Sequence, residues 1–126
     1  MTGVKSYRDL LVWQNAIDLA ARIYELTKTF PRDEIYGMTS QLRRASVSIS
    51  SNLAEGYGRD TTGAYIQLWR TARGSLNEVE SQLEVCLRVG LLNPPKVHET
   101  LQDAGKLSRM LSALIRSTEA SPKPKA

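Results

Sequence analysis

The chain has 126 residues, of which 41% are hydrophobic and 24% charged, a composition typical of one globular domain that argues against a disordered chain. One Cys and one His exclude an internal disulfide framework and a His-rich metal centre. The net charge of +4 invites a nucleic-acid partner, but the excess is mild and lies mostly in residues 94–126, which carry six basic and three acidic groups.

No membrane segment or secretion signal is expected. The longest uncharged run, Ala45–Ala54, has ten residues, whereas a spanning helix needs about 20 mostly apolar ones. The first residues, Met1–Lys5, lack the apolar core of a signal peptide. The sequence therefore predicts a cytoplasmic protein without a membrane partner.

A first helix is predicted over residues 7–29, after an N-terminal extension at 1–6. Ser6 and Asp9 have the spacing of a capping box at its start, and Pro31 follows its end. Two apolar stripes run side by side, one of Leu10, Trp13, Ile17, Ala20 and Tyr24, the other of Ala16, Ile23 and Phe30. They cover about half of the helix circumference, more than a surface helix needs. We therefore expect this helix to be buried against a neighbour outside its own bundle as well.

A second helix is predicted over residues 33–57, with an apolar stripe at three- and four-residue steps. The stripe consists of Met38, Leu42, Ala45, Ile49 and Leu53. Closely spaced Ser and Asn residues weaken the intrinsic helix propensity, so packing has to stabilise this helix. Gly56 and Gly58 are suitable residues to end it.

A third helix is predicted over 63–89 and a fourth over 94–117, followed by a disordered tail at 119–126. Both helices carry long apolar seams. Because the connections are short, consecutive helices should run antiparallel. The expected fold class is all-α: one up-down-up-down four-helix bundle over residues 7–118, assembled into a cyclic homo-oligomer.

The residue types of common catalytic and metal sites are missing from the sequence. The residue three before the single histidine, His98, is Pro95, so the Glu-x-x-His pattern of di-iron bundles is absent. Cys86 falls in the seam of the third helix and is expected to be a small core residue. We therefore expect no enzymatic activity, no cofactor and no metal.

Polar residues beside the apolar seams are the better candidates for a helix junction, a subunit contact or a recognition surface. Gln41, Ser48 and Asn52 flank the stripe of the second helix, with Arg44 and Glu55 just outside them. Folding the second and third helices about Asp60 predicts an Arg44–Glu80 ion pair. Gly74 lies in mid-helix, where a glycine usually permits close approach, here of Trp13, Trp69 or a neighbouring subunit.

Five arginines on the second and third helices are the candidate nucleic-acid contacts, because arginine binds phosphate bidentately. They are Arg43, Arg44, Arg59, Arg70 and Arg73. The alternative is that they are solvated or paired within the protein. A continuous positive rim on the oligomer favours nucleic-acid binding, whereas scattered, neutralised arginines favour a different role.

Four blocks of sequence resemble a known family. They are Leu10-x-x-Trp13-x-x-Ala16; Phe30-Pro31-x-x-Glu34-x-Tyr36-Gly37-Met38-x-x-Gln41-Leu42-Arg43-Arg44-Ala45; Ser48-Ile49-x-x-Asn52-Leu53-Ala54-Glu55-Gly56; and Ala72-Arg73-Gly74-Ser75-Leu76-x-Glu78-x-Glu80-x-Gln82-Leu83. We call them the signature blocks. In order and spacing they resemble the 23S rRNA-intervening-sequence proteins over about residues 7–116.

The resemblance implies a small bundle, encoded in some members within bacterial 23S rRNA genes, with no associated catalytic activity. It also implies similarity to the accessory protein of diversity-generating retroelements, a basic pentameric barrel, so a homopentamer is expected. The motif residues expected to be structural or to form interfaces are Trp13, Gln41, Asn52, Glu55, Gly56, Gly74 and Glu80. Two functions stay open: an adaptor that binds RNA or DNA through a basic surface, and a protein–protein scaffold without a nucleic-acid role.

Overall fold

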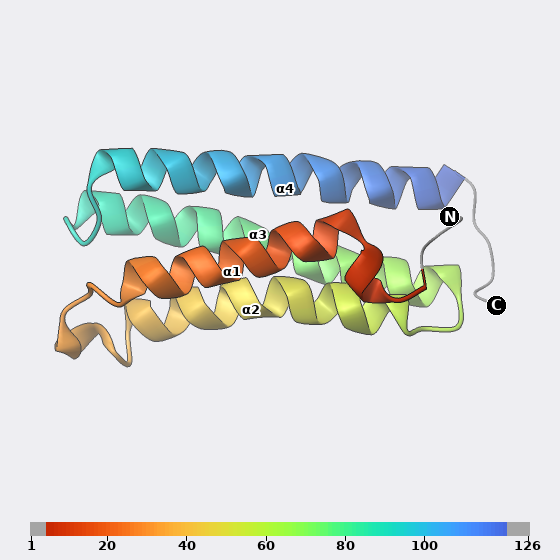
Figure 1. Cartoon of the computed structure of the whole chain (residues 1–126), viewed down its shortest axis with the longest axis horizontal. Coiled ribbons are helices and arrows are strands. Elements are labelled where there is room, and N and C mark those ends of the chain that lie inside the picture. Colours follow the sequence, from red (N-terminus) through yellow and green to blue (C-terminus); the bar gives the residue numbers. More distant parts are fainter. Residues whose placement is uncertain (1–4, 121–126) are drawn as a thin grey trace.

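Four antiparallel α-helices form the molecule, as the sequence predicts (Figure 1). The computed structural model describes residues 5–120. Within that range there is no strand. The α-helices are α1 (Leu11–Thr27), α2 (Met38–Tyr57), α3 (Thr62–Arg88) and α4 (Pro94–Ala120), and the two short 3-10 helices are η1 (Tyr7–Asp9) and η2 (Arg32–Glu34).

The first α-helix is shorter than predicted because Leu10 interrupts the helical conformation. This residue has an extended backbone (φ −74°, ψ 124°) between η1 and α1. The capping box of Ser6 and Asp9 is confirmed, but it caps η1 rather than α1. Trp13 lies in the first turn of α1 and packs edge-on against Tyr7, with ring centroids 5.2 Å apart.

The second helix begins at Met38, five residues later than predicted. Residues 32–34 form η2 instead, and the Glu34 carboxylate accepts the backbone N–H of Met38 at 3.1 Å. At the other end Gly58 is the C-cap, as predicted, whereas Gly56 lies inside the helix. The fourth helix continues to Ala120, past the predicted start of the tail, and residues 121–126 lie outside the described range.

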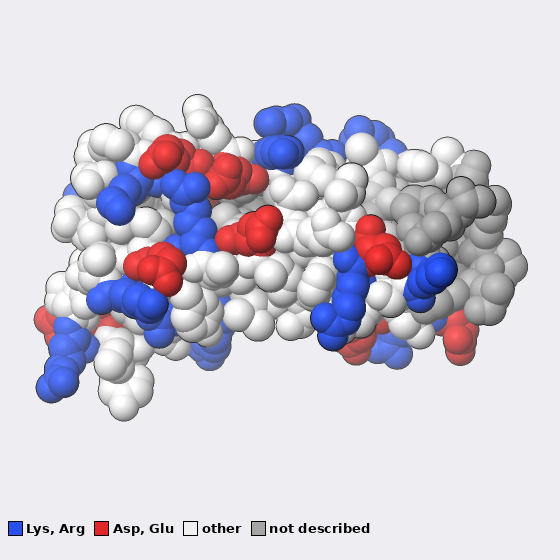
Figure 2. Space-filling view, viewed as in Figure 1, with Lys and Arg blue, Asp and Glu red and all other residues white. Residues whose placement is uncertain are grey.

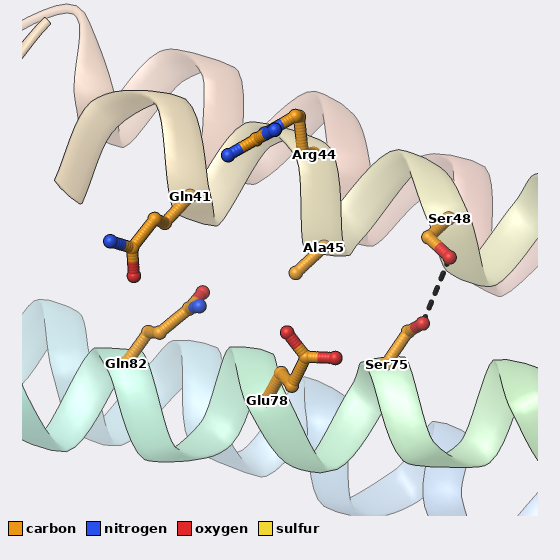
Figure 3. Close-up of a pocket in the computed structure, with 7 residues that line it drawn as sticks. All are labelled: Gln41, Arg44, Ala45, Ser48, Ser75, Glu78 and Gln82. Carbon is orange, nitrogen blue, oxygen red and sulfur yellow. Dashed lines mark hydrogen bonds between the residues drawn. The ribbon is translucent and has the colours of Figure 1, made fainter. Parts of the chain in front are cut away.

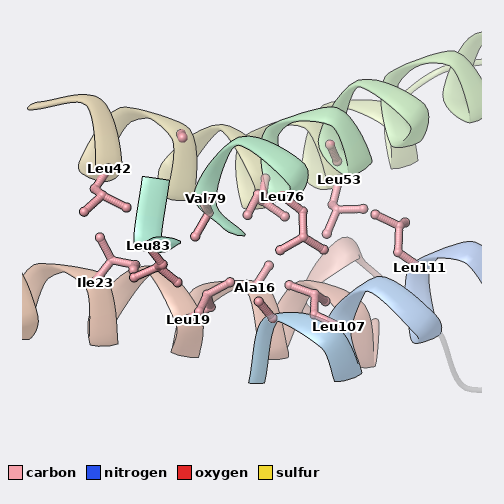
Figure 4. Packing of buried hydrophobic residues seen from close by; sticks show 14 of the residues in the cluster. Ala16, Leu19, Ile23, Leu42, Leu53, Leu76, Val79, Leu83, Leu107 and Leu111 are labelled. Carbon is pink, nitrogen blue, oxygen red and sulfur yellow. The ribbon is translucent and has the colours of Figure 1, made fainter. Parts of the chain in front are cut away.

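The core runs along the bundle axis and receives side chains from all four helices (Figure 4). Its largest fully buried members include Ile23, Leu42, Leu76, Leu83 and Leu107. Of the stripes predicted for the first helix, the one with Ala16 and Ile23 is buried, together with Val12 and Leu19. The other stripe is only partly buried, because 39% of Ile17 and 41% of Tyr24 stay exposed.

Neither Trp13 nor Trp69 approaches Gly74, so this part of the prediction is wrong, and the close approach within the chain occurs at Gly56 instead. The approach of a neighbouring subunit to Gly74 stays a prediction. No heavy atom lies within 4 Å of the position a Cβ would take at Gly74, which is exposed. A Cβ at Gly56 would lie 2.8 Å from Cδ1 and Nε1 of Trp69. The indole is buried there, and its N–H donates to the carbonyl of Leu53 at 3.4 Å. Gly56 therefore permits α2 to pack closely against α3.

Candidate functional site

A polar groove lies between α2 and α3, with a volume of about 390 Å³ (Figure 3). We call it the α2–α3 groove. From α2 it is lined by Gln41, Arg44, Ala45 and Ser48, and from α3 by Ser75, Glu78 and Gln82. The groove is open because Ala45 and the two serines are too small to fill the space between the helices.

A short hydrogen-bond network lies at one end of the groove (Figure 3). The hydroxyls of Ser48 and Ser75 lie 2.9 Å apart, on facing helices. Asn52 Nδ2 donates to the Ser48 carbonyl at 2.8 Å and to its hydroxyl at 3.0 Å. These contacts explain why polar residues flank the apolar stripe of α2: they join it to α3 and satisfy one another.

The walls of the groove, in contrast, hold polar groups without partners. Arg44 and Glu78 are exposed, and in the described range neither makes an ion pair. Gln82 Oε1 is buried and accepts no hydrogen bond. An unsatisfied buried acceptor costs about 1–3 kcal/mol. The groove therefore presents a cation, an anion and an acceptor that a bound group can satisfy.

The predicted Arg44–Glu80 ion pair is not formed. Arg73 Nη1 donates to Ser112 Oγ of α4 at 3.4 Å, so this side of α3 faces α4. Glu80 lies two turns further along α3 and shares that side. Glu78 is the acidic residue of α3 that faces Arg44 across the groove. The predicted register was close, but the wrong carboxylate was chosen.

Four of the five candidate arginines interact with groups of their own chain. Arg43 donates to Thr27 Oγ1 at 2.8 Å and lies 4.5 Å from the ring centroid of Tyr24. Arg59 pairs with Glu55 at 2.7 Å, and Arg70 pairs with Glu119. Arg73 contacts Ser112, and of the five only Arg44 makes no such contact with another residue between 5 and 120. These pairs reduce the positive charge that the five residues offer to phosphate.

Free positive charge gathers instead on α4, along the upper edge of Figure 2. Lys106, Arg109 and Arg116 are exposed there, and we call them the α4 basic stripe. Their spacings of three and seven residues place them on one side of the helix over about 15 Å. The sequence analysis noted the charge excess of this segment but missed the stripe, which the same helical spacing reveals.

The acidic residues of α4 do not neutralise this stripe, because they are paired with other helices. Glu99 and Asp103 both contact Arg22 of α1, at 3.3 and 2.8 Å. Glu119 pairs with Arg70 of α3. No cation of the stripe makes an ion pair within residues 5–120. Arg109 and Arg116 are therefore free cations, whereas Lys106 shares a pocket with Asp18 and Asp103 without forming an ion pair.

The single cysteine and histidine lie apart from the groove. Cys86 is fully buried, and desolvation, with a smaller contribution from the Glu34 carboxylate, raises the pKa of its thiol to about 11. His98 is exposed on the second turn of α4. Between residues 5 and 120 no three His, Cys, Asp or Glu residues group as metal ligands. No helix of this segment has the length and apolarity required to cross a membrane.

One family model matches most of the chain. A family model described as 23S rRNA-intervening sequence protein matches residues 8–113. A solved structure of a protein with unknown function from the S23 ribosomal protein family of Bacteroides thetaiotaomicron superposes with a TM-score of 0.79. It is 22% identical over 84% of this chain and 96% of that chain, so it supports the fold alone. The search of curated proteins found no match.

All seven residues that line the α2–α3 groove belong to the signature blocks. Five of them, Gln41, Arg44, Ser48, Glu78 and Gln82, are at least partly exposed polar residues. The blocks therefore describe a surface site as well as the packing of the bundle.

Proposed function

We propose, since this chain belongs to the 23S rRNA-intervening sequence protein family, that it is a non-enzymatic, self-assembling protein scaffold of the cytoplasm. Its subunits would contact one another through the α2–α3 groove and close into a ring, with five subunits as the expected number. One observation carries this proposal. The α2–α3 groove carries charged and amide groups, Arg44, Glu78 and Gln82 Oε1, that find no ion pair or hydrogen bond within residues 5–120.

The physical argument is that an interface supplies what the groove lacks. Buried polar groups in stable contacts are paired, and an interface that pairs them gains specificity. The arginines favour the scaffold over the basic-surface adaptor, because Arg43, Arg59 and Arg70 interact with their own chain. This is the scattered, neutralised pattern expected of a protein scaffold.

A second groove, between α1 and α2, supports the same role. It has a volume of about 400 Å³, and its lining includes Tyr24, Val47 and Ser51. Tyr24 and Val47 are among the exposed large hydrophobic residues of the bundle. Arg44 and Ser48 line both grooves, so the outward side of α2 is flanked by open space on each side. A surface of this kind is suited to contact with another helix.

Replacement of Arg44 by alanine is expected to weaken self-association about tenfold, because the lost cation contacts an acidic or aromatic group of the neighbouring subunit. Native mass spectrometry over a concentration series measures the effect. Arg88→Ala is the matched control, since Arg88 is also an exposed arginine without an ion pair within the described range. A wild-type protein that stays monomeric throughout the series would overturn the scaffold proposal.

A second candidate function is nucleic-acid binding through the α4 basic stripe, favoured by its three cations without an ion pair within the described range. The matched family is named after 23S rRNA, so an RNA of that origin is the first probe to use. Phosphate contacts depend on free charge, and each one contributes to the salt dependence of binding. The stripe is therefore a better candidate than the paired arginines.

The triple replacement of Lys106, Arg109 and Arg116 by alanine is expected to lower RNA affinity at least tenfold. It should also reduce the slope of log affinity against log salt by about 2 to 3, one phosphate contact per cation. The comparison variant Arg43→Ala/Arg70→Ala removes two arginines that the chain itself engages. An equal loss in both variants would assign binding to the whole basic surface, and no loss in either would exclude both sets of residues.

A further inference from the structure

The connection between α1 and α2 carries an unusually exposed aromatic residue. Tyr36 is 96% exposed, and its neighbour Ile35 is 49% exposed. We call residues 32–37 the knob. An aromatic side chain this exposed gains nothing from the fold of its own chain. Tyr36 nevertheless belongs to the signature blocks, like the residues of the α2–α3 groove.

The knob is held by hydrogen bonds that do not involve Tyr36. The backbone N–H of Glu34 donates to the Pro31 carbonyl at 3.0 Å, and that of Gly37 donates to the Glu34 carbonyl at 3.0 Å. The Glu34 carboxylate accepts the N–H of Met38 at the start of α2. The backbone on both sides of Tyr36 is therefore preorganised, which lowers the entropy lost when the ring is bound.

The chemistry of the α2–α3 groove matches a phenol. The groove is open to solvent and, at about 390 Å³, is large enough to admit one aromatic ring. A tyrosine hydroxyl can donate the hydrogen bond that the buried Gln82 Oε1 lacks. The free Arg44 guanidinium can lie over the ring, as Arg43 lies over Tyr24 within the chain.

The charges of the two surfaces are also complementary. On the knob, Arg32 and Asp33 are exposed, and neither makes an ion pair in the described part of the chain. The groove offers Glu78 and Arg44, which are equally unpaired. With Glu34, the knob thus carries one cation and two anions, and the groove carries one of each, so Arg44 of the groove has an anionic surface to face.

We propose that Tyr36 of one copy of this chain occupies the α2–α3 groove of a neighbouring copy. Its hydroxyl donates to Gln82 Oε1, and its ring lies against Arg44. This inference rests on the proposed self-assembly and names the contact that produces it. Knob and groove are different surfaces of one subunit. Two copies that exchange the contact reciprocally form a two-fold dimer, whereas a contact made in one direction only generates a ring if the rotation closes.

A disulfide trap tests the contact directly. Chains carrying Tyr36→Cys and isotope-labelled chains carrying Gln82→Cys are mixed under mild oxidation, and mass spectrometry counts mixed dimers. We expect mixed dimers to exceed those from Tyr36→Cys with Gln67→Cys, a control at an exposed position of the same helix. Gln41→Cys, on the opposite wall, is a second trap position. The native Cys86 is buried, and its raised pKa of about 11 keeps it from competing.

Affinity provides the second test. Tyr36→Ala is expected to raise the dissociation constant of the assembly about 30-fold, as a buried aromatic anchor would, and Tyr36→Phe about fivefold through the lost hydroxyl. The thermal midpoint of the isolated subunit should not change, because Tyr36 is exposed there. If the wild type assembles, but Tyr36→Ala assembles equally well and no trap exceeds the control, this contact is wrong and the scaffold proposal stands. If the wild type stays monomeric, both fail.

Discussion

Replacement of Leu76 by alanine is expected to lower the free energy of unfolding by about 3 kcal/mol. Leu76 is fully buried in the centre of α3 and points into the core shared by all four helices (Figure 4). The substitution removes apolar contacts and leaves a cavity that long, regular helices cannot collapse around. Leucine-to-alanine changes at such sites cost about 2–5 kcal/mol.

Urea unfolding, followed by circular dichroism at one fixed subunit concentration, measures the Leu76 effect, because self-association would otherwise shift the midpoint. Leu11→Ala is the matched control, since Leu11 is 65% exposed at the start of α1. We expect its free energy of unfolding to change by less than about 0.5 kcal/mol. A loss below about 1 kcal/mol in Leu76→Ala would contradict the close packing described for the core.

The change of Gly56 to alanine is expected to lower the free energy of unfolding by about 2 kcal/mol. The new Cβ would lie 2.8 Å from the Trp69 ring and 3.0 Å from the Tyr65 carbonyl oxygen. Because the indole is buried, α2 and α3 have to move apart, and overpacking of this kind costs about 1–3 kcal/mol, occasionally more. The higher helix propensity of alanine offsets this destabilisation by up to about 1 kcal/mol.

The same substitution at Gly74 should have the opposite sign. Gly74 also lies inside a helix, but nothing is within 4 Å of its Cβ position. Gly74→Ala should therefore raise the free energy of unfolding by about 0.5–1 kcal/mol, from helix propensity alone. Thermal unfolding of the two variants beside the wild type gives the comparison. Shifts of equal sign would show that Gly56 does not limit the approach of α2 and α3.

Much of the fold follows from the spacing of apolar residues. Most of the predicted seam residues of α2, α3 and α4 are buried, because a three- and four-residue period places them on one side of a helix whatever its neighbours are. At the start of α3 the prediction is wrong, since Ile66 and Trp69 are buried there while Tyr65 and Leu68 are only partly buried. The start of α2 could not be found in this way. Residues 32–37 carry no periodic signal, and the contact of Glu34 with Met38 forms only in the local fold.

The role of the two glycines illustrates a second limit. Composition and position made Gly74 the candidate for close contact and Gly56 a helix end. The distances reverse these roles, because the approach of Trp69 depends on the crossing of α2 and α3 and on the rotation of each helix about its axis. The sequence alone specifies neither the crossing angle of the two helices nor their rotation.

The sequence likewise identified only some of the residues of the candidate site. The sequence identified Gln41, Arg44 and Asn52 as polar residues at a helix junction. Gln41 and Arg44 line the groove, and Asn52 donates a hydrogen bond to the Ser48 carbonyl at one end of it. The sequence did not identify Gln82 or Glu78 as their counterparts. A shift of two residues along α3 turns a carboxylate from α2 towards α4, which is finer than a sequence-derived register can resolve.

By itself, then, the sequence determined the fold class, the buried seams and the family, because these depend on local periodicity and on motifs whose order and spacing the chain carries directly. Only the tertiary structure decided which charges are free. Ion pairing depends on distances between side chains of different helices, such as Arg70 with Glu119 and Arg22 with Asp103. Those distances leave Arg44 and the cations of the α4 basic stripe without an ion pair within residues 5–120.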